Sequence, residues 1–155
     1  MKIMVATDGS EYSRAALAAL DKLLPLQEAE VILLTVVPWP VGGDISSLLG
    51  PPYVDYSQLE QQIQSEGEHR LAAGKAILQS GGILPQTVLL KGDPATEILE
   101  YAQQQRPDLI VVGSHGRKGF QRLLLGSVSG KVVNDASCPV LIVKLPSLGS
   151  HLTNI

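Results

Sequence analysis

A glycine-rich loop between an apolar run and a new helix is the feature of this chain best suited to chemistry. The apolar run Leu109–Val112 ends in Gly113, Ser114, His115 and Gly116, and a helix is expected to start at Gly126-Ser127. Glycines let a backbone approach a ligand closely, and a helix N-terminus presents free N–H groups to an anion. A strand, a loop and a helix in this order are typical of a phosphate-binding site.

Several polar side chains fall in or beside this loop. Arg117 could pair with outer phosphates, whereas Lys118 and Arg122 are better explained as solvated basic residues. His115 could contact phosphate, but no carboxylate or nucleophile at a suitable spacing supports catalysis.

Asp8 follows the first predicted strand and precedes Gly9. A carboxylate there could hold Mg²⁺ or a ribose hydroxyl, or it could simply form an Asp-Gly turn. Ala6 and Thr7 would then line the ribose or base side of the same site.

Two better-known nucleotide motifs are incomplete. Gly126-Ser127-Val128-Ser129-Gly130-Lys131 has one residue too few between its glycines for a Walker A loop, and Val132 stands where Ser or Thr is needed. The first turn carries only Gly9, so the dinucleotide fingerprint is absent too. P-loop hydrolysis and NAD binding are therefore unsupported.

The elements that must position these residues alternate along the chain. Strands are predicted at Lys2–Ala6, Glu30–Val37, Gln86–Leu90, Leu109–Val112 and Pro139–Lys144. Helices are predicted from an N-cap at Ser10 to Pro25, over Gln58–Ser80 despite Gly67 and Gly74, from Asp93-Pro94 onward, and over Ser127–Ala136. This order predicts an α/β fold, a parallel sheet with helices on both faces, with ligands beyond the carboxyl ends of the strands.

The loop motif Gly113-x2-Gly116-x9-Gly126-Ser127 resembles the ATP-binding signature of the universal stress protein family. Ile3–Ser10 resembles the family's first strand and turn, and Ser137–Val143 its last strand, so the similarity spans about Met1 to Lys144. The resemblance implies a Rossmann-like, adenine nucleotide alpha hydrolase-like sheet in the order 3-2-1-4-5, with the crevice between the first and fourth strands. It also implies that the main chain at Val36 meets adenine.

Together these arguments give one set of expected nucleotide-binding residues: Ala6, Thr7, Asp8, Val36, Gly113, Ser114, His115, Gly116, Arg117, Gly126, Ser127 and Val128. The expected ligand is ATP, with AMP or ADP as alternatives, and Mg²⁺ would be held through the phosphates and Asp8. The expected function is nucleotide binding in stress response or regulation, without catalysis. The alternatives are a slow ATPase, an AMP-binding sensor and a nucleotide-free interaction module.

Composition limits the class of protein. The 155 residues predict one domain over 1–145 with a flexible tail over 146–155, and 45% hydrophobic against 17% charged residues excludes wholesale disorder. A net charge of −3 disfavours nucleic acid as a partner. One cysteine, Cys138, cannot form an internal disulfide, and the apolar run at the N-terminus is too short for a signal peptide or membrane span, so we expect a cytoplasmic protein.

Two further expectations concern surfaces. The apolar strand Val140–Val143 would lie at the sheet edge, and the family resemblance implies that two copies pair there as a homodimer. Pro38–Ser57 is rich in Pro and Gly and contains the one tryptophan, Trp39. It predicts a long loop, either a lid or partner surface or a partly ordered insertion.

Overall fold

The structure is a computed structural model that describes residues 1–24, 28–39, 56–117 and 125–145. The predicted tail 146–155, most of the predicted loop Pro38–Ser57, and Pro25, Lys118 and Arg122 lie outside the described residues.

Five parallel strands form one sheet in the order β3-β2-β1-β4-β5. This confirms the fold class and the strand order expected from the resemblance. The strands run over Lys2–Ala6 (β1), Glu30–Val37 (β2), Gln86–Lys91 (β3), Leu109–Gly113 (β4) and Val140–Val143 (β5). Their ends differ from the sequence prediction by at most one residue, within the usual uncertainty of element boundaries.

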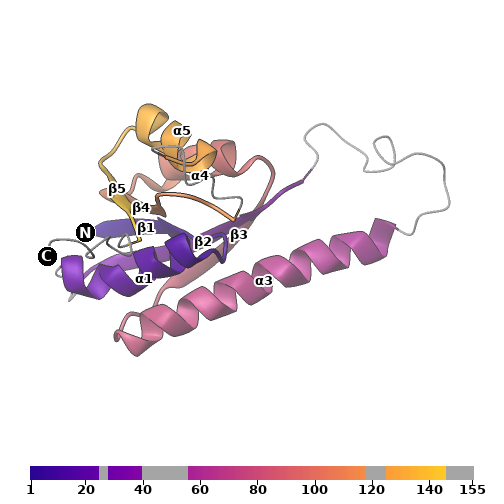
Figure 1. The fold of residues 1–155 in the computed structure, drawn as a ribbon, viewed down its shortest axis with the longest axis horizontal. Coiled ribbons are helices and arrows are strands. Elements are labelled where there is room, and N and C mark those ends of the chain that lie inside the picture. Colours follow the sequence, from indigo (N-terminus) through magenta and orange to yellow (C-terminus); the bar gives the residue numbers. More distant parts are fainter. Residues whose placement is uncertain (25–27, 40–55, 118–124, 146–155) are drawn as a thin grey trace, which may run out of the picture.

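Within the described residues, four helices cover the sheet, two on each face (Figure 1). They span Glu11–Leu23 (α1), Tyr56–Ser80 (α3), Pro94–Gln105 (α4) and Ser127–Asp135 (α5). Helix α3 starts two residues before the predicted Gln58, so the last residue of the predicted loop, Ser57, is helical. Its N-terminal part runs beyond the strands, as Figure 1 shows.

The two helix layers divide the core according to the alternation of each strand. In β1, Ile3 and Val5 pack with α1 and α3, whereas Met4 packs with α4 and α5. Successive side chains of a strand point to opposite faces, so a central strand covered on both faces must be apolar throughout. This is why Glu30–Val37 is a nearly continuous apolar run, buried from Val31 onward.

The glycines of α3 allow close packing against neighbouring elements. A Cβ on Gly67 would lie 2.5 Å from Leu89 Cδ1, and one on Gly74 would lie 3.1 Å from a Leu33 methyl group. Their low helix propensity is therefore offset by the close approach of α3 to the sheet, a benefit that periodicity alone does not reveal.

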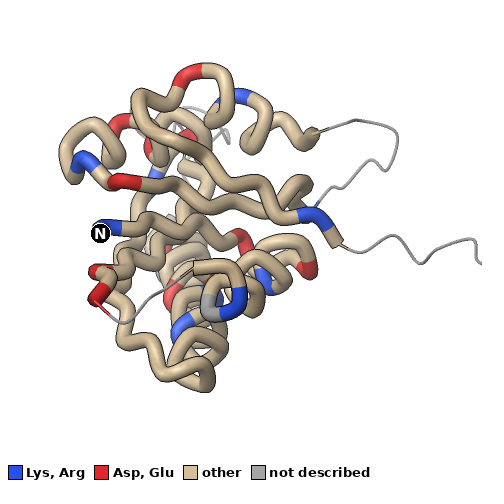
Figure 2. Tube along the Cα trace, turned by 90° about the vertical axis from the view of Figure 1, so that its left-hand side faces the viewer, with Lys and Arg blue, Asp and Glu red and all other residues tan. Residues whose placement is uncertain are grey.

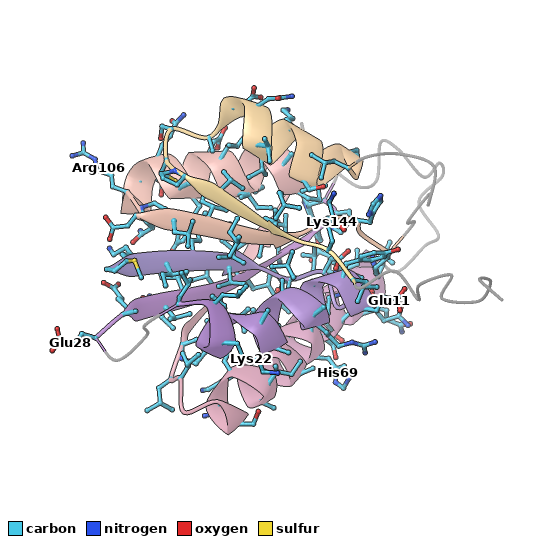
Figure 3. All side chains as sticks on the ribbon, turned by 60° about the vertical axis from the view of Figure 1, so that its left-hand side comes forward. Glu11, Lys22, Glu28, His69, Arg106 and Lys144 are labelled. Atoms are coloured by element: carbon cyan, nitrogen blue, oxygen red, sulfur yellow. The ribbon has the colours of Figure 1, made fainter. Side chains whose placement is uncertain are left out.

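Charged residues of both signs are spread over several elements in the view of Figure 2. His69 is exposed on α3 (Figure 3). No helix among the described residues is long and apolar enough to cross a membrane.

Candidate functional site

A cavity of about 470 Å³ opens beyond the carboxyl ends of β1, β2 and β4. The N-terminal residues of α4 and α5 complete it, and residues from α1 and α3 reach it from the other helix layer. This is the position that parallel α/β sheets use for ligands, where the strand order reverses between β1 and β4.

The cavity is lined by every residue predicted to bind nucleotide except Ser114. β1 and its following turn contribute Ala6, Thr7 and Asp8; β2 contributes Val36; β4 and its loop contribute Gly113, His115, Gly116 and Arg117; and the start of α5 contributes Gly126, Ser127 and Val128.

Ser114 is buried and anchors the loop through backbone hydrogen bonds. It is 1% exposed, and its N–H donates to the Val143 carbonyl oxygen over 2.9 Å. Its own carbonyl oxygen accepts from the Gly126 N–H over 2.8 Å and from Ser129 Oγ over 2.9 Å. Ser114 therefore connects the loop to β5 and to the start of α5, while its side chain lies 3.1 Å from His115 Nδ1.

Packing within the protein requires a glycine at position 113 and brings Gly116 close to the Asp8 side chain. A Cβ on Gly113 would lie 2.7 Å from the carbonyl carbon of Tyr12, in the first turn of α1. A Cβ on Gly116 would lie 2.9 Å from Asp8 Oδ2. The sequence argument assigned these glycines to close approach of a ligand, but the structure shows that they first let β4 and its loop approach α1 and Asp8.

The N-terminus of α5 faces the cavity without a side-chain cap. Gly126 occupies the N-cap position and makes no capping hydrogen bond, while Ser127 and Val128 line the cavity. The N–H groups of the first turn of a helix have no partner within the helix, and the helix dipole places partial positive charge there. The arrangement suits an anionic ligand group.

Asp8 joins the two loops that frame the cavity. Its Oδ1 accepts from the Ser10 N–H and its Oδ2 from the Arg117 N–H, each over 3.0 Å. Gly9 follows with φ +78°, as expected for an Asp-Gly turn. The turn-forming role of Asp8 is thus visible, and the same carboxylate also fixes the start of Arg117.

Arg70 of α3 is a cavity residue that the sequence argument missed. Its side chain is 8% exposed, and it shares the carboxylate of Glu66 with Arg117. Arg117 Nη1 lies 2.9 Å from Glu66 Oε1, and the hydrogen bond and charge of Arg70, with a smaller effect of Arg117, lower the pKa of Glu66. The predicted helix gave no signal for Arg70, because its periodicity marks apolar residues.

Other missed lining residues are Ser13, Leu34, Pro38, Pro94, Ile98, Val112 and Ser129. Leu34, Ile98 and Val112 were identifiable as apolar, but periodicity does not show which core residues end at a cavity. They give one side of the cavity an apolar wall near Val36.

His115 lines the cavity and also packs against Tyr12 of α1. Its ring centroid lies 5.1 Å from that of Tyr12. The residues that the structure describes contain no group of three or more His, Cys, Asp or Glu side chains placed to hold a metal ion.

These features define a doubly wound α/β domain with a ligand cavity at the point where its strand order reverses. The chain matches the model of the universal stress protein family over residues 1–144, and it belongs to that family.

Individual relatives agree with this placement. The universal stress protein YxiE of Bacillus subtilis is 39% identical, over 92% of this chain and 98% of its own. The solved structure of protein MJ0577, from Methanocaldococcus jannaschii, has a TM-score of 0.77 and 29% identity, covering 94% of this chain and 96% of that one. An Arabidopsis thaliana family member solved with AMP bound has a TM-score of 0.68 and 24% identity, covering 97% of both chains.

Proposed function

We propose that this protein binds an adenine nucleotide in the cavity and acts as a nucleotide-responsive stress or regulatory protein. The observation that carries the proposal is the uncapped N-terminus of α5 opening into a cavity whose other side is apolar. The phosphates would meet the N–H groups of Ser127 and Val128 and the loop at Gly116, while the base would lie against Val36 and Ile98.

The shape and polarity of the cavity support this assignment. Its volume of about 470 Å³ lies within the range of about 300–1,000 Å³ typical of small-molecule sites. A nucleotide is apolar at its base and anionic at its phosphates, which matches the two sides. The AMP-bound Arabidopsis protein is an example of this fold holding an adenine nucleotide.

ATP is the proposed ligand, with ADP and AMP as alternatives that titration separates. Mg²⁺, if it accompanies the nucleotide, would be held chiefly through the phosphates. Each oxygen of the Asp8 carboxylate already accepts one backbone N–H, and each keeps one lone pair that could face the ion.

Binding rather than catalysis is the proposed activity. The Asp8 carboxylate accepts two backbone N–H groups, and Ser114 Oγ, the hydroxyl 3.1 Å from His115 Nδ1, is buried and does not line the cavity. ATP turnover above background that Asp8→Ala abolishes would favour the slow ATPase instead.

We also propose a cytoplasmic homodimer formed through β5. In the part of the chain that the structure describes, this strand pairs with β4 alone, and all four of its apolar residues remain partly exposed. A second copy pairing with the open edge would cover it. Light scattering at micromolar concentration should give twice the mass of the chain, and a monomer mass would contradict the proposal.

The first test of nucleotide binding is to denature the purified protein and identify any released nucleotide by chromatography. Calorimetric titration with ATP, ADP and AMP follows. Absence of both released nucleotide and binding heat would favour the nucleotide-free interaction module.

A charge variant then tests the location of the site. Ser127→Glu places a carboxylate at the start of α5, where it suits the helix dipole but repels phosphate. We expect nucleotide affinity to fall at least tenfold while the protein stays as stable as the wild type. Ser137→Glu adds the same charge at an exposed position outside the cavity and should bind normally. If Ser127→Glu and Ser137→Glu bound nucleotide equally well, the nucleotide would have to bind away from the start of α5.

A further inference from the structure

Arg70 reaches the cavity from the helix layer opposite α4 and α5. Its aliphatic part lies over Gly9: a Cβ on Gly9 would be 3.3 Å from Arg70 Cγ and 3.7 Å from Cδ. Because residue 9 has no side chain, the arginine can cross the turn after β1. Its guanidinium thereby belongs to the same cavity as Asp8, Gly116 and Arg117.

The guanidinium of Arg70 has hydrogen-bonding capacity to spare. Among residues 1–24, 28–39, 56–117 and 125–145, Glu66 is its one hydrogen-bond partner, and no buried nitrogen there lacks one. A guanidinium carries five N–H donors. The nitrogens of Arg70 that Glu66 does not hold are therefore accessible to solvent, and Arg70 lines the cavity.

Fold stability does not explain this arrangement. Glu66 is four residues from Arg70 on the same helix, and its side chain is 55% exposed. A pair with such an exposed carboxylate contributes little to stability, whereas burying the arginine has a desolvation cost. One carboxylate also serves two guanidiniums, so the cluster formed by Glu66, Arg70 and Arg117 has one positive charge in excess.

Both arginines lie beside the proposed phosphate site. Arg117 belongs to the glycine-rich loop, and its N–H is fixed by Asp8. A guanidinium can donate two parallel hydrogen bonds to two oxygens of one phosphate. Two arginines with spare N–H donors therefore suit a terminal phosphate.

We propose that Arg70 and Arg117 form a two-arginine site for the outermost phosphate of the nucleotide, and that Glu66 holds both guanidiniums in place until the phosphate replaces it. The inference rests on the proposed function and adds to it a preference: the protein binds nucleoside triphosphate or diphosphate more tightly than monophosphate. Arg70, from α3, is then a specificity-determining residue outside the glycine-rich motif.

The central test compares Arg70→Met with the wild type by titration with ATP, ADP, AMP and adenosine. Methionine keeps an unbranched apolar chain over Gly9 and removes the charge. Loss of a charge-assisted hydrogen bond predicts a fall in ATP affinity of about tenfold to a hundredfold. The affinities for AMP and adenosine should change less than about twofold, since neither has an outer phosphate.

Three further variants make the test specific. Lys75→Met removes an exposed charge from the same helix outside the cavity and should leave every affinity unchanged. Arg70→Lys keeps the charge without the fork and should lie between wild type and Arg70→Met. Glu66→Gln removes the competing carboxylate and should raise ATP affinity about fivefold at low salt, but not adenosine affinity. It keeps the proposal testable if Arg70→Met does not fold.

The outcomes separate this inference from the proposed function. If the wild type binds none of the four ligands, both are overturned. If ATP binds the wild type and Arg70→Met equally while Ser127→Glu abolishes binding, only the two-arginine site is overturned. An equal loss of ATP and AMP affinity in Arg70→Met would also overturn the assignment to the outermost phosphate.

Discussion

Helices α4 and α5 both begin at the cavity, but their N-termini are built in opposite ways. At α4, the Asp93 carboxylate accepts from the Thr96 N–H over 3.0 Å and from its hydroxyl over 2.7 Å, and Pro94 brings no N–H at all. At α5, Gly126 provides no side-chain cap. The cap of α4 thus bonds an N–H group of its first turn, whereas the first turn of α5 has no side-chain cap and can face a ligand.

The difference shows how a fold can select one anion site among several helix ends. α1 resembles α4, because Ser10 Oγ accepts from the Ser13 N–H over 3.2 Å. Capping contributes stability, and an uncapped terminus forgoes it. Of these three termini, α5 is the one without a side-chain cap, and its first two residues line the cavity, so it is the one suited to a phosphate.

The largest expected effect comes from Gly113→Ala, which would disturb the packing of β4 against the first turn of α1. The new Cβ would meet backbone atoms of Tyr12 and Ser13, which cannot move aside as a side chain can. We expect the free energy of unfolding to fall by about 3 kcal/mol, measured by urea denaturation.

Gly130→Ala is the matched control, since among the described residues its Cβ would have no neighbour closer than 4.0 Å. Inside α5, alanine should raise the free energy of unfolding by about 0.5–1 kcal/mol. If Gly113→Ala were as stable as the wild type but lost nucleotide, Gly113 would serve the ligand rather than the fold.

Asp93→Ala should remove the side-chain N-cap of α4. We expect a loss of about 1 kcal/mol in the free energy of unfolding, because the Thr96 N–H loses the Asp93 carboxylate that accepts its hydrogen bond. ATP affinity should stay within about twofold of wild type, because a helix that begins with proline offers fewer N–H groups. A large gain in affinity would show that α4 is a second anion site held closed by its cap.

Ser127→Ala is the counterpart at α5, with the opposite pattern. Its stability should remain within about 0.5 kcal/mol of wild type, as for an exposed residue that caps nothing. Calorimetry should show ATP affinity reduced about tenfold, the cost of one hydrogen bond from a hydroxyl to a charged phosphate. Unchanged affinity would leave only the backbone of α5 as the phosphate contact.

The smallest effect is the pH dependence of the α4 cap. Hydrogen bonds from Thr96 lower the pKa of Asp93, so the ionised carboxylate contributes stability above the ordinary pKa, and this is lost as the pH falls through the lowered value. Asp93→Asn keeps a capping oxygen without the charge. Urea denaturation should show a difference from wild type at neutral pH that shrinks in acid, below about pH 3.9; a difference that grows in acid would contradict this.

The predictions from sequence succeeded where the signal is local. Local signals predicted the N-cap at Ser10, the start of α4 at Asp93 and the start of α5. The order of strands and helices along the chain was predicted in the same way. Each of these features depends on residues that are close together in the sequence. The order of the strands did not follow from alternation and came from the family motifs. The role of Arg70 was not predictable, because its neighbours in space, Gly9 and Arg117, lie far away in the chain.

Short-range periodicity and backbone preference are enough to predict the elements, the α/β class and the position of the glycine-rich loop. Which residues share the cavity, and what they do there, depends on how the elements pack in three dimensions. Asp8 bonds Arg117 across 109 positions of the chain, and Gly113 is required by α1 rather than by its own loop. Contacts of this kind arise when the helix layers pack on the sheet, so no local pattern records them.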